Sequence, residues 1–458
     1  MILHSLLRLL PLWLMGFLLV DLLWPGRLRK DLLFKLALGI GVGQGVDSCL
    51  YFFWIMAFGP SMQHLMTVEY GLCIFLTGMA ALRSFSQPRE DVSSGPAPLA
   101  REWVLLAGFL VLLLGSAAGF FLLTVTRPYG TFDAYAIWNL KARFMFIDPQ
   151  HWQNAFSTAL NWKTQPDYPL LVPLNVLRLW ELLGAEVPRA GALLSASYTF
   201  GLVGLIFAAF YRLRDLGQAA LAGILMLATP AVLMIGTAQT ADLPLAYSML
   251  AAALMFYLAV GEPHPGYIIL SGLMGGLAAW TKNEGIVFLI LLALSALGMW
   301  FKHPRRLAWM VIGLALPLAA VLVFKLQYAP PNDLMAGQSL ATILPKLVDL
   351  PRYGTILGSL GQNLLTVGGW KLPILIVLLL GALLLRHQLP PQEKTVYWVF
   401  CGLVLLTLAG FCAVYVITPH PLEWHLKYSM DRLMLQIFPM LLCLLLLGMR
   451  TPREWGRE

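Results

Sequence analysis

Long apolar runs recur along the whole chain, and they restrict its fold more than any other feature of the sequence. An α-helix needs about 20 apolar residues to cross a bilayer, whereas the strands of a membrane β-barrel appear as short segments of alternating polarity. Charged residues make up only 12% of the chain and hydrophobic residues 59%, which excludes an ordinary soluble domain. The sequence therefore predicts an all-α polytopic membrane protein.

The apolar runs predict about thirteen spans, of which the shortest are also compatible with halves of a hairpin. The expected bundle therefore has about 11–13 transmembrane helices. The first run lacks a small-residue cleavage site, so we expect a span there and not a signal peptide. The expected spans cover residues 6–25, 32–58, 64–84, 104–125, 191–211, 218–236, 243–260, 267–281, 285–301, 307–327, 368–385, 396–417 and 430–449.

Basic loops indicate which face of the membrane is cytoplasmic, because cytoplasmic loops carry an excess of Lys and Arg. These loops are 27–31, 83–102, 212–215, 302–306 and 386–394. They account for much of the net charge of +8, so we expect no nucleic-acid partner. The predicted location is the inner membrane of a bacterium, with several spans.

The opposite face receives two long segments, 128–190 and 328–367. Long irregular segments in a compact protein are usually functional, and amphipathic helices within them could lie along the membrane surface. The chain is thus expected to have an N-terminal three-span unit, a cytoplasmic linker, a main transmembrane region and a cytoplasmic tail. Their expected bounds are 1–85, 86–102, 103–450 and 451–458.

Polar residues near a membrane are costly and tend to mark function, and several gather on this outer face. If residues 133–146 are helical, Asp133 could share the rim of a cleft with Lys141 and Arg143. The competing interpretation is a surface helix whose charges face water. We expect the span centres, in contrast, to be free of ionisable residues, with the polar residues mostly at helix ends.

Two later outer segments also carry carboxylates. Asp167 stands between two prolines, which predicts a rigid extended loop, although a turn or helix cap is the alternative. Asp242 opens an apolar helix, where it could also be an N-cap. Lys282 and Glu284 lie at the tip of a hairpin, where they could simply be solvated.

The last span opens with "SMDRLMLQIFP", which places Arg432 and Gln436 one helical turn apart on one face. An Arg just inside a span requires an anionic partner, and the alternative is that it extends to lipid phosphate. His425 precedes it at the same membrane surface. Together these segments would surround a site with carboxylates and cations, which suits an anionic lipid headgroup and a hydroxyl that must lose its proton.

Metal binding stays an open question. A divalent metal could bridge Asp167 and a phosphate, with His425 or His151 as a further ligand, but no spacing of these residues requires it. The five cysteines show no spacing typical of a metal site. No cofactor is therefore predicted with certainty.

The order of five short motifs resembles that of the GT-C-fold glycosyltransferases, in particular the protein O-mannosyltransferases and the lipid A aminoarabinose transferases. The resemblance covers residues 104–449. The motifs are "FDAYAIW", "QPDYPLL", "ADLPLAY", "TKNEG" and "SMDRLMLQIFP". It implies a GT-C-like bundle that moves a sugar from a polyprenyl-phosphate donor to a glycan, lipid or protein acceptor on the extracytoplasmic face.

The resemblance also implies roles for the candidate residues. Asp133 would be the general base for the acceptor hydroxyl, and Asp167 would act on the acceptor or on a metal. Lys282 and Arg432 would lie near the donor phosphate, with Lys141 and Arg143 as further cations. The cavity and acceptor side would be lined by Asp242, Glu284, Tyr168, Trp138 and His425.

The sequence departs from the resemblance in two ways. It lacks the Lys-Pro-Pro run of aminoarabinose transferases, so Lys163 or Lys141 would have to replace that phosphate contact. Three further expected spans also precede the span at 104–125, which leads into the first large outer loop, whereas in the family that loop usually follows the first span. Two other functions stay open: a transporter or flippase of lipid-linked envelope precursors, which predicts ionisable residues near mid-bilayer, and a scaffold of envelope synthesis, in which polar side chains need not converge.

Overall fold

The computed structural model describes residues 2–26, 30–60, 62–86, 97–160, 162–334, 336–387 and 389–455. Most of the expected linker, residues 87–96, and the end of the expected tail, residues 456–458, lie outside this part. The helices of the first half are α1 (Ile2–Leu23), α2 (Asp31–Phe58), α3 (Met62–Ser86), α4 (Ala100–Thr126), η1 (Ala134–Trp138), α5 (Asn139–Ile147), η2 (Pro149–Phe156), η3 (Trp162–Thr164), α6 (Leu171–Leu183), α7 (Arg189–Leu213) and α8 (Leu216–Ala228).

The second half is also helical, and within the described residues the structure has no β-strand apart from an isolated bridge between Arg386 and Met449. Its helices are α9 (Pro230–Thr237), α10 (Asp242–Gly261), α11 (Pro265–Thr281), α12 (Asn283–Trp300), α13 (Pro304–Gln327), α14 (Leu340–Val348), α15 (Leu350–Leu365), η4 (Val367–Gly369), α16 (Ile374–Leu384), α17 (Pro391–Ile417) and α18 (Leu422–Leu447).

The prediction of an all-α polytopic membrane protein is confirmed. In the described part of the chain, nine helices are long and apolar enough to cross a membrane, or up to eleven if each of two bent pairs is one span. The runs at 218–236 and 368–385 fall on these pairs, which bend by 59° and 89°. The run at 267–281 forms α11, whose 17 residues are short for a span, and the run at 6–25 forms α1, which is not among the nine.

The centre of the bundle is α10, whose apolar window is 94% buried. It packs against α7, α11, α17 and α18, and its many alanines allow these helices to approach closely. In contrast, the apolar window of α4 is only 11% buried, so most of its apolar side chains are not covered by the rest of the protein. Since α10 and α18 are neighbours in the bundle, Asp242 at the start of α10 and Arg432 in the first half of α18 come together.

The expectation that span centres carry no ionisable residues is wrong for α2, because Asp47 lies near the middle of that helix. Asp47 and Glu69 are buried, and both pair with Arg178 of α6. The Arg178 Nε atom lies 3.2 Å from Asp47 Oδ2, and Nη2 lies 2.5 Å from Glu69 Oε2. This triad joins the N-terminal helices to α6, which begins shortly after the loop that holds Asp167.

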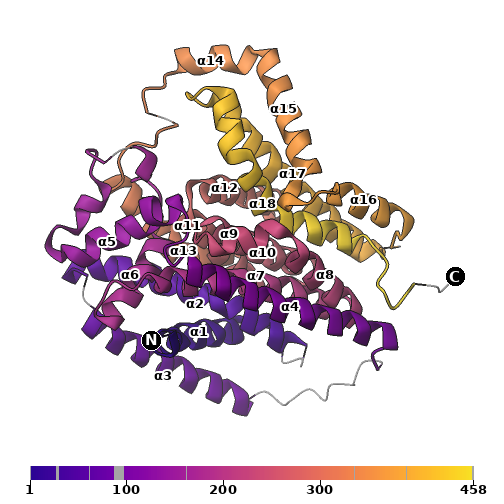
Figure 1. Ribbon diagram of the computed structural model, residues 1–458. Helices are drawn as coiled ribbons and strands as arrows, with labels where there is room; N and C mark the ends of the chain where they lie inside the picture. Colours follow the sequence, from indigo (N-terminus) through magenta and orange to yellow (C-terminus); the bar gives the residue numbers. More distant parts are fainter. Residues whose placement is uncertain are drawn as a thin grey trace.

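Short helices occupy both long outer segments, as expected. In the second segment, α14 and α15 pack on the outer ends of α17 and α18 and protrude from the main bundle (Figure 1). Arg352 of α15 donates to the carbonyls of Tyr415 and Val416 at the end of α17. In the first segment α6 is buried and does not lie along the surface, because it packs under α2, α5 and α7.

Candidate active site

Asp133 stands immediately before the five-residue π-helix η1. Single π-turns inside helices are uncommon and often occur at functional sites. The loop before it is held against the end of α9: the Thr131 amide donates to the Ala238 carbonyl at 3.2 Å, and the Gln239 side chain donates to the Pro128 carbonyl at 3.0 Å. This docking places Asp133 next to the start of α10.

Gly130 is required for that docking. Its φ is +70°, and a Cβ atom there would lie 2.5 Å from the Ala238 carbonyl oxygen. Neither the left-handed conformation nor the close approach suits a residue with a side chain. The glycine thus allows two segments more than a hundred residues apart in the sequence to touch.

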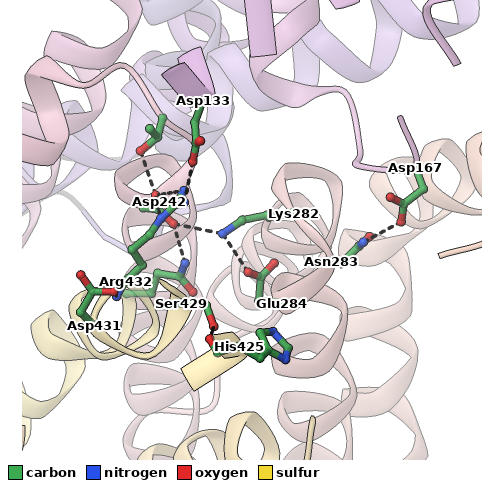
Figure 2. Close-up of polar contacts among 12 residues, drawn as sticks. Asp133, Asp167, Asp242, Lys282, Asn283, Glu284, His425, Ser429, Asp431 and Arg432 are labelled. Atoms are coloured by element: carbon green, nitrogen blue, oxygen red, sulfur yellow. Dashed lines mark hydrogen bonds and ion pairs between the residues drawn. The ribbon is translucent and has the colours of Figure 1, made fainter. Parts of the chain in front are cut away.

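Arg432 joins the two carboxylates at this point (Figure 2). Its Nη1 atom lies 2.5 Å from Asp133 Oδ2, and its Nε and Nη2 atoms lie 3.0 and 2.7 Å from Asp242 Oδ2. Asp242 is fully buried and also accepts from Gln436 at 2.7 Å and Thr240 at 2.8 Å. Its carboxylate is thus a fixed element of the site and does not cap α10, whose N-cap residue is Ala241.

Lys282 completes this network from the turn between α11 and α12. Its Nζ atom lies 3.1 Å from Asp242 Oδ1 and 2.8 Å from Glu284 Oε1. Burial by itself would lower the pKa of Lys282, but the two carboxylates raise it above the usual value, so the residue stays cationic. Gly285 permits the tight turn, because a Cβ atom there would lie 1.9 Å from the Ala278 carbonyl oxygen.

We call Asp133, Asp242, Lys282, Glu284 and Arg432 the ion network. They come from four separate segments of the chain, and the structure joins these five side chains through direct contacts. Three carboxylates face two cations, so the network carries a formal charge of −1. Cations held in this way in a poorly solvated site are suited to an anionic group.

Asp167 lies in a second network beside the first. Its Oδ2 atom accepts from Asn283 and from Asn332, each at 2.8 Å, and lies 3.2 Å from Lys325 Nζ. Lys325 also donates to the Asp167 carbonyl at 2.6 Å. Successive residues of the "KNE" turn therefore belong to different networks. Asn283 contacts Asp167, whereas Lys282 pairs with both Asp242 and Glu284 (Figure 2).

Tyr168 lies between the two networks. Its ring is 5.8 Å from Lys282 Nζ and 5.6 Å from the ring of the buried Trp138. Burial, with nearby carboxylates, raises the pKa of Tyr168 well above its usual range, so the phenol stays neutral. These two aromatic residues thus form one apolar wall of the site.

The structure does not bring Lys141 and Arg143 to the rim beside Asp133. Lys141 is buried, and its Nζ atom donates to the carbonyl of Gln165 at 2.7 Å. Arg143 is 58% exposed and pairs with Glu186 at 3.2 Å. The π-helix explains the difference, because its wider turn changes the direction of every side chain that follows it.

His425 lies outside the ion network. Its Nδ1 atom is 2.9 Å from Thr418 Oγ1, and its ring contacts those of Tyr415 and His420 at 4.8 and 5.8 Å. In the described part of the chain, no group of three or more His, Cys, Asp or Glu side chains could hold a metal ion. His151, the other candidate ligand, is exposed and pairs with Asp148 at 3.0 Å.

Five participants in the two networks were not predicted as site residues. Lys325 lies near the end of an otherwise apolar run, and Asn283 and Gln436 belong to polar motifs, so the sequence offers a signal for these three. The five residues are Thr240, Asn283, Lys325, Asn332 and Gln436.

Comparison with known families bears on these residues directly. Residues 167–324 match the family model described as dolichyl-phosphate-mannose-protein mannosyltransferase. The matched segment includes Asp167, Asp242 and Lys282, whereas Asp133 and Arg432 lie on either side of it. Comparisons with curated proteins and with solved structures gave no match. Within a multi-pass membrane protein, residues 167–324 thus match a GT-C-type glycosyltransferase domain, that of the dolichyl-phosphate-mannose-protein mannosyltransferase family.

Proposed function

We propose that this protein transfers a sugar from a polyprenyl-phosphate donor to an acceptor hydroxyl, with inversion, at the extracytoplasmic face of a bacterial inner membrane. The observation that carries this proposal is the position of Arg432 between Asp133 and Asp242, with Lys282 on the other side of Asp242. A candidate base and two cations thus lie together at the ends of membrane helices. The acceptor is a glycan, a lipid or a protein.

In this mechanism, Asp133 takes the proton of the acceptor hydroxyl as its oxygen attacks the anomeric carbon. The new C–O bond forms while the bond between that carbon and the phosphate oxygen breaks, and the polyprenyl phosphate leaves with the electron pair. Arg432 and Lys282 stabilise the charge that develops on the leaving phosphate. The prenyl chain stays between helices in the bilayer, so only the headgroup reaches the ion network.

The domain division is part of the proposal. Residues 103–450 would be the catalytic region, and residues 1–85 would form an accessory unit that the Asp47–Glu69–Arg178 triad joins to α6. Asp167 would position Tyr168 and the "KNE" turn, since its carboxylate is already held by Lys325 and two asparagines. This role differs from direct action on the acceptor or on a metal.

The proposal is tested by transfer from a radiolabelled pool of polyprenyl-phosphate sugars in membranes that contain the protein. Asp133→Asn should lower transfer by about 10²–10⁴-fold, because a general base contributes on that order. Asp431→Asn is the matched control, since that carboxylate is adjacent but accepts only from the backbone amide of Arg432. Unchanged transfer by Asp133→Asn would show that Asp133 is not the general base. Absence of transfer by the unsubstituted protein would contradict the proposed function.

A transporter or flippase is the second candidate, and one observation favours it. Asp47 lies near the middle of the candidate span α2 and forms a buried triad with Glu69 and Arg178, and transporters place ionisable groups at such positions. In proteoliposomes, movement of a fluorescent polyprenyl phosphate that depends on Asp47 and persists in Asp133→Asn would support transport. Transfer without such movement supports the enzyme.

A further inference from the structure

The two carboxylates on Arg432 are held unequally. Asp242 is fully buried, and its two oxygens accept from four side chains, Arg432, Lys282, Gln436 and Thr240. Asp133 is 27% exposed, and within the described residues its only ion-pair partner is Arg432. Removing Asp242 from this position would break a buried set of bonds, whereas Asp133 can leave by rotation of one side chain.

We infer that Asp133 and the phosphate of the lipid donor compete for the same edge of the Arg432 guanidinium. In the resting protein Asp133 occupies that edge, and the arriving phosphate takes it over and releases the carboxylate. Asp242 is then a positioning residue that keeps Arg432 in place throughout the exchange. This inference rests on the proposed function and goes beyond it, because it makes the base available only when the donor is bound.

Geometry supports the exchange. Arg432 donates through Nε and Nη2 to the buried Asp242 and through Nη1 to Asp133, which is the partly exposed carboxylate of the two. A guanidinium presents donors in a fixed planar fork that accepts a phosphate as readily as a carboxylate. A phosphate can therefore replace Asp133 without any movement of α18.

Charge supports it as well. Three carboxylates and two cations give the resting network a formal charge of −1, which opposes the entry of an anion. When a phosphate replaces Asp133, the displaced carboxylate moves away from Arg432, and the oxygen that accepted from Nη1 becomes available to an acceptor hydroxyl. The released carboxylate can then take the proton that the transfer step removes.

The inference predicts an unusual phenotype for the base variant. Asp133→Asn should bind the donor phosphate more tightly than the unsubstituted protein while it loses transfer, because it removes the competitor. A simple structural defect would weaken binding instead. An increase of at least about fivefold is expected, at the low end of typical couplings between two ligands.

The experiment measures binding of farnesyl phosphate to the full-length protein in lipid nanodiscs. Farnesyl phosphate carries the phosphate and a short prenyl chain but no sugar, so the sugar need not be known. Asp133→Asn and Asp133→Ala should both bind it more tightly, Asp242→Asn should bind it more weakly, and Arg432→Gln should not bind it. Asp431→Asn removes the same charge nearby without freeing the guanidinium edge and should bind like the unsubstituted protein.

The outcomes separate the inference from the proposed function. If Asp133→Asn binds farnesyl phosphate no more tightly while Arg432→Gln loses binding, the exchange is wrong but the phosphate site stands. If Asp431→Asn tightens binding as much as Asp133→Asn, general charge repulsion explains the effect and the exchange is wrong. If neither the unsubstituted protein nor any variant binds, both the exchange and the proposed function fail.

Discussion

Arg432 Nη1 lies 2.5 Å from Asp133 Oδ2, although the two residues are 299 positions apart in the chain. One precedes a π-helix in the first long outer segment, and the other lies in the first part of α18. Helix packing around α10 brings them together, because α10 contacts α18 and the loop before Asp133 docks beside the start of α10. The predictions that follow depend on this convergence.

Replacing Asp242 should destabilise the whole bundle. Asp242→Asn leaves Arg432 and Lys282 without their shared buried carboxylate, and breaking a buried ion pair in this way costs about 3–5 kcal/mol. Denaturant unfolding in detergent should show a lower free energy of unfolding by that amount. Asp431→Asn, at an exposed position, should leave the free energy within about 0.5 kcal/mol, and an equal loss in both variants would contradict the role of Asp242.

Lys282 and Arg143 should differ sharply in their effect on transfer. Lys282→Gln removes a buried cation of the ion network and should lower transfer by about 10²–10³-fold. Arg143→Gln removes an exposed cation whose pair with Glu186 is worth about 0–1 kcal/mol, so transfer should stay near normal. Initial rates with the same donor pool compare the two, and similar losses would mean that Arg143 reaches the phosphate after all.

Asp167 should contribute mainly to the stability of the loop that holds it, and less to the transfer reaction itself. Asp167→Asn leaves Lys325 without its carboxylate partner, which should destabilise the loop by about 1–3 kcal/mol. Hydrogen exchange should then rise in residues 162–170. Asp148→Asn is a suitable control because Asp148 is exposed on the same outer segment. Unchanged exchange with lost transfer would instead favour a direct role of Asp167 on the acceptor.

Lys141 should make stability depend on pH. Burial is the main reason that its pKa falls to about 7, although Asp167 opposes the shift, whereas in the unfolded chain the pKa is about 10.5. Above pH 7 the unfolded chain binds more protons at this residue than the folded protein, so the free energy of unfolding rises with pH until about pH 10. The unfavourable contribution of the charged amine is fully present below pH 7.

The measurement compares thermal unfolding of Lys141→Met with that of the unsubstituted protein between pH 6 and pH 9. The unsubstituted protein should gain stability relative to the variant as the pH rises through 7, since methionine does not titrate. A constant difference across this range would show that Lys141 keeps its proton and that the carbonyls of Gln165 and Thr164 hold it as an ammonium.

Much of the fold could be predicted from the sequence. Twenty-residue apolar runs have few folds open to them, because a backbone in lipid must satisfy its own hydrogen bonds. The all-α polytopic class and many of the spans follow from that rule. The positions of Asp133, Asp242 and Arg432 beside apolar runs could also be read from the sequence. An apolar run does not indicate where a helix bends, however. The structure breaks two of the runs, at Thr229–Pro230 and before Ile374, so it has fewer straight spans than the sequence predicts.

The pairing of the charged residues was decided only by the tertiary structure. The sequence offers Lys141 and Arg143 as further cations beside Lys282, but one π-turn directs the first into the carbonyls of a loop and the second to the surface. Lys325 lies near the end of an expected span in the sequence, and only the packing of α13 shows that it pairs with Asp167. Charge, polarity and apolar length are local properties that a sequence carries by itself, whereas the choice of partner depends on which helix ends meet, and packing around α10 determines that.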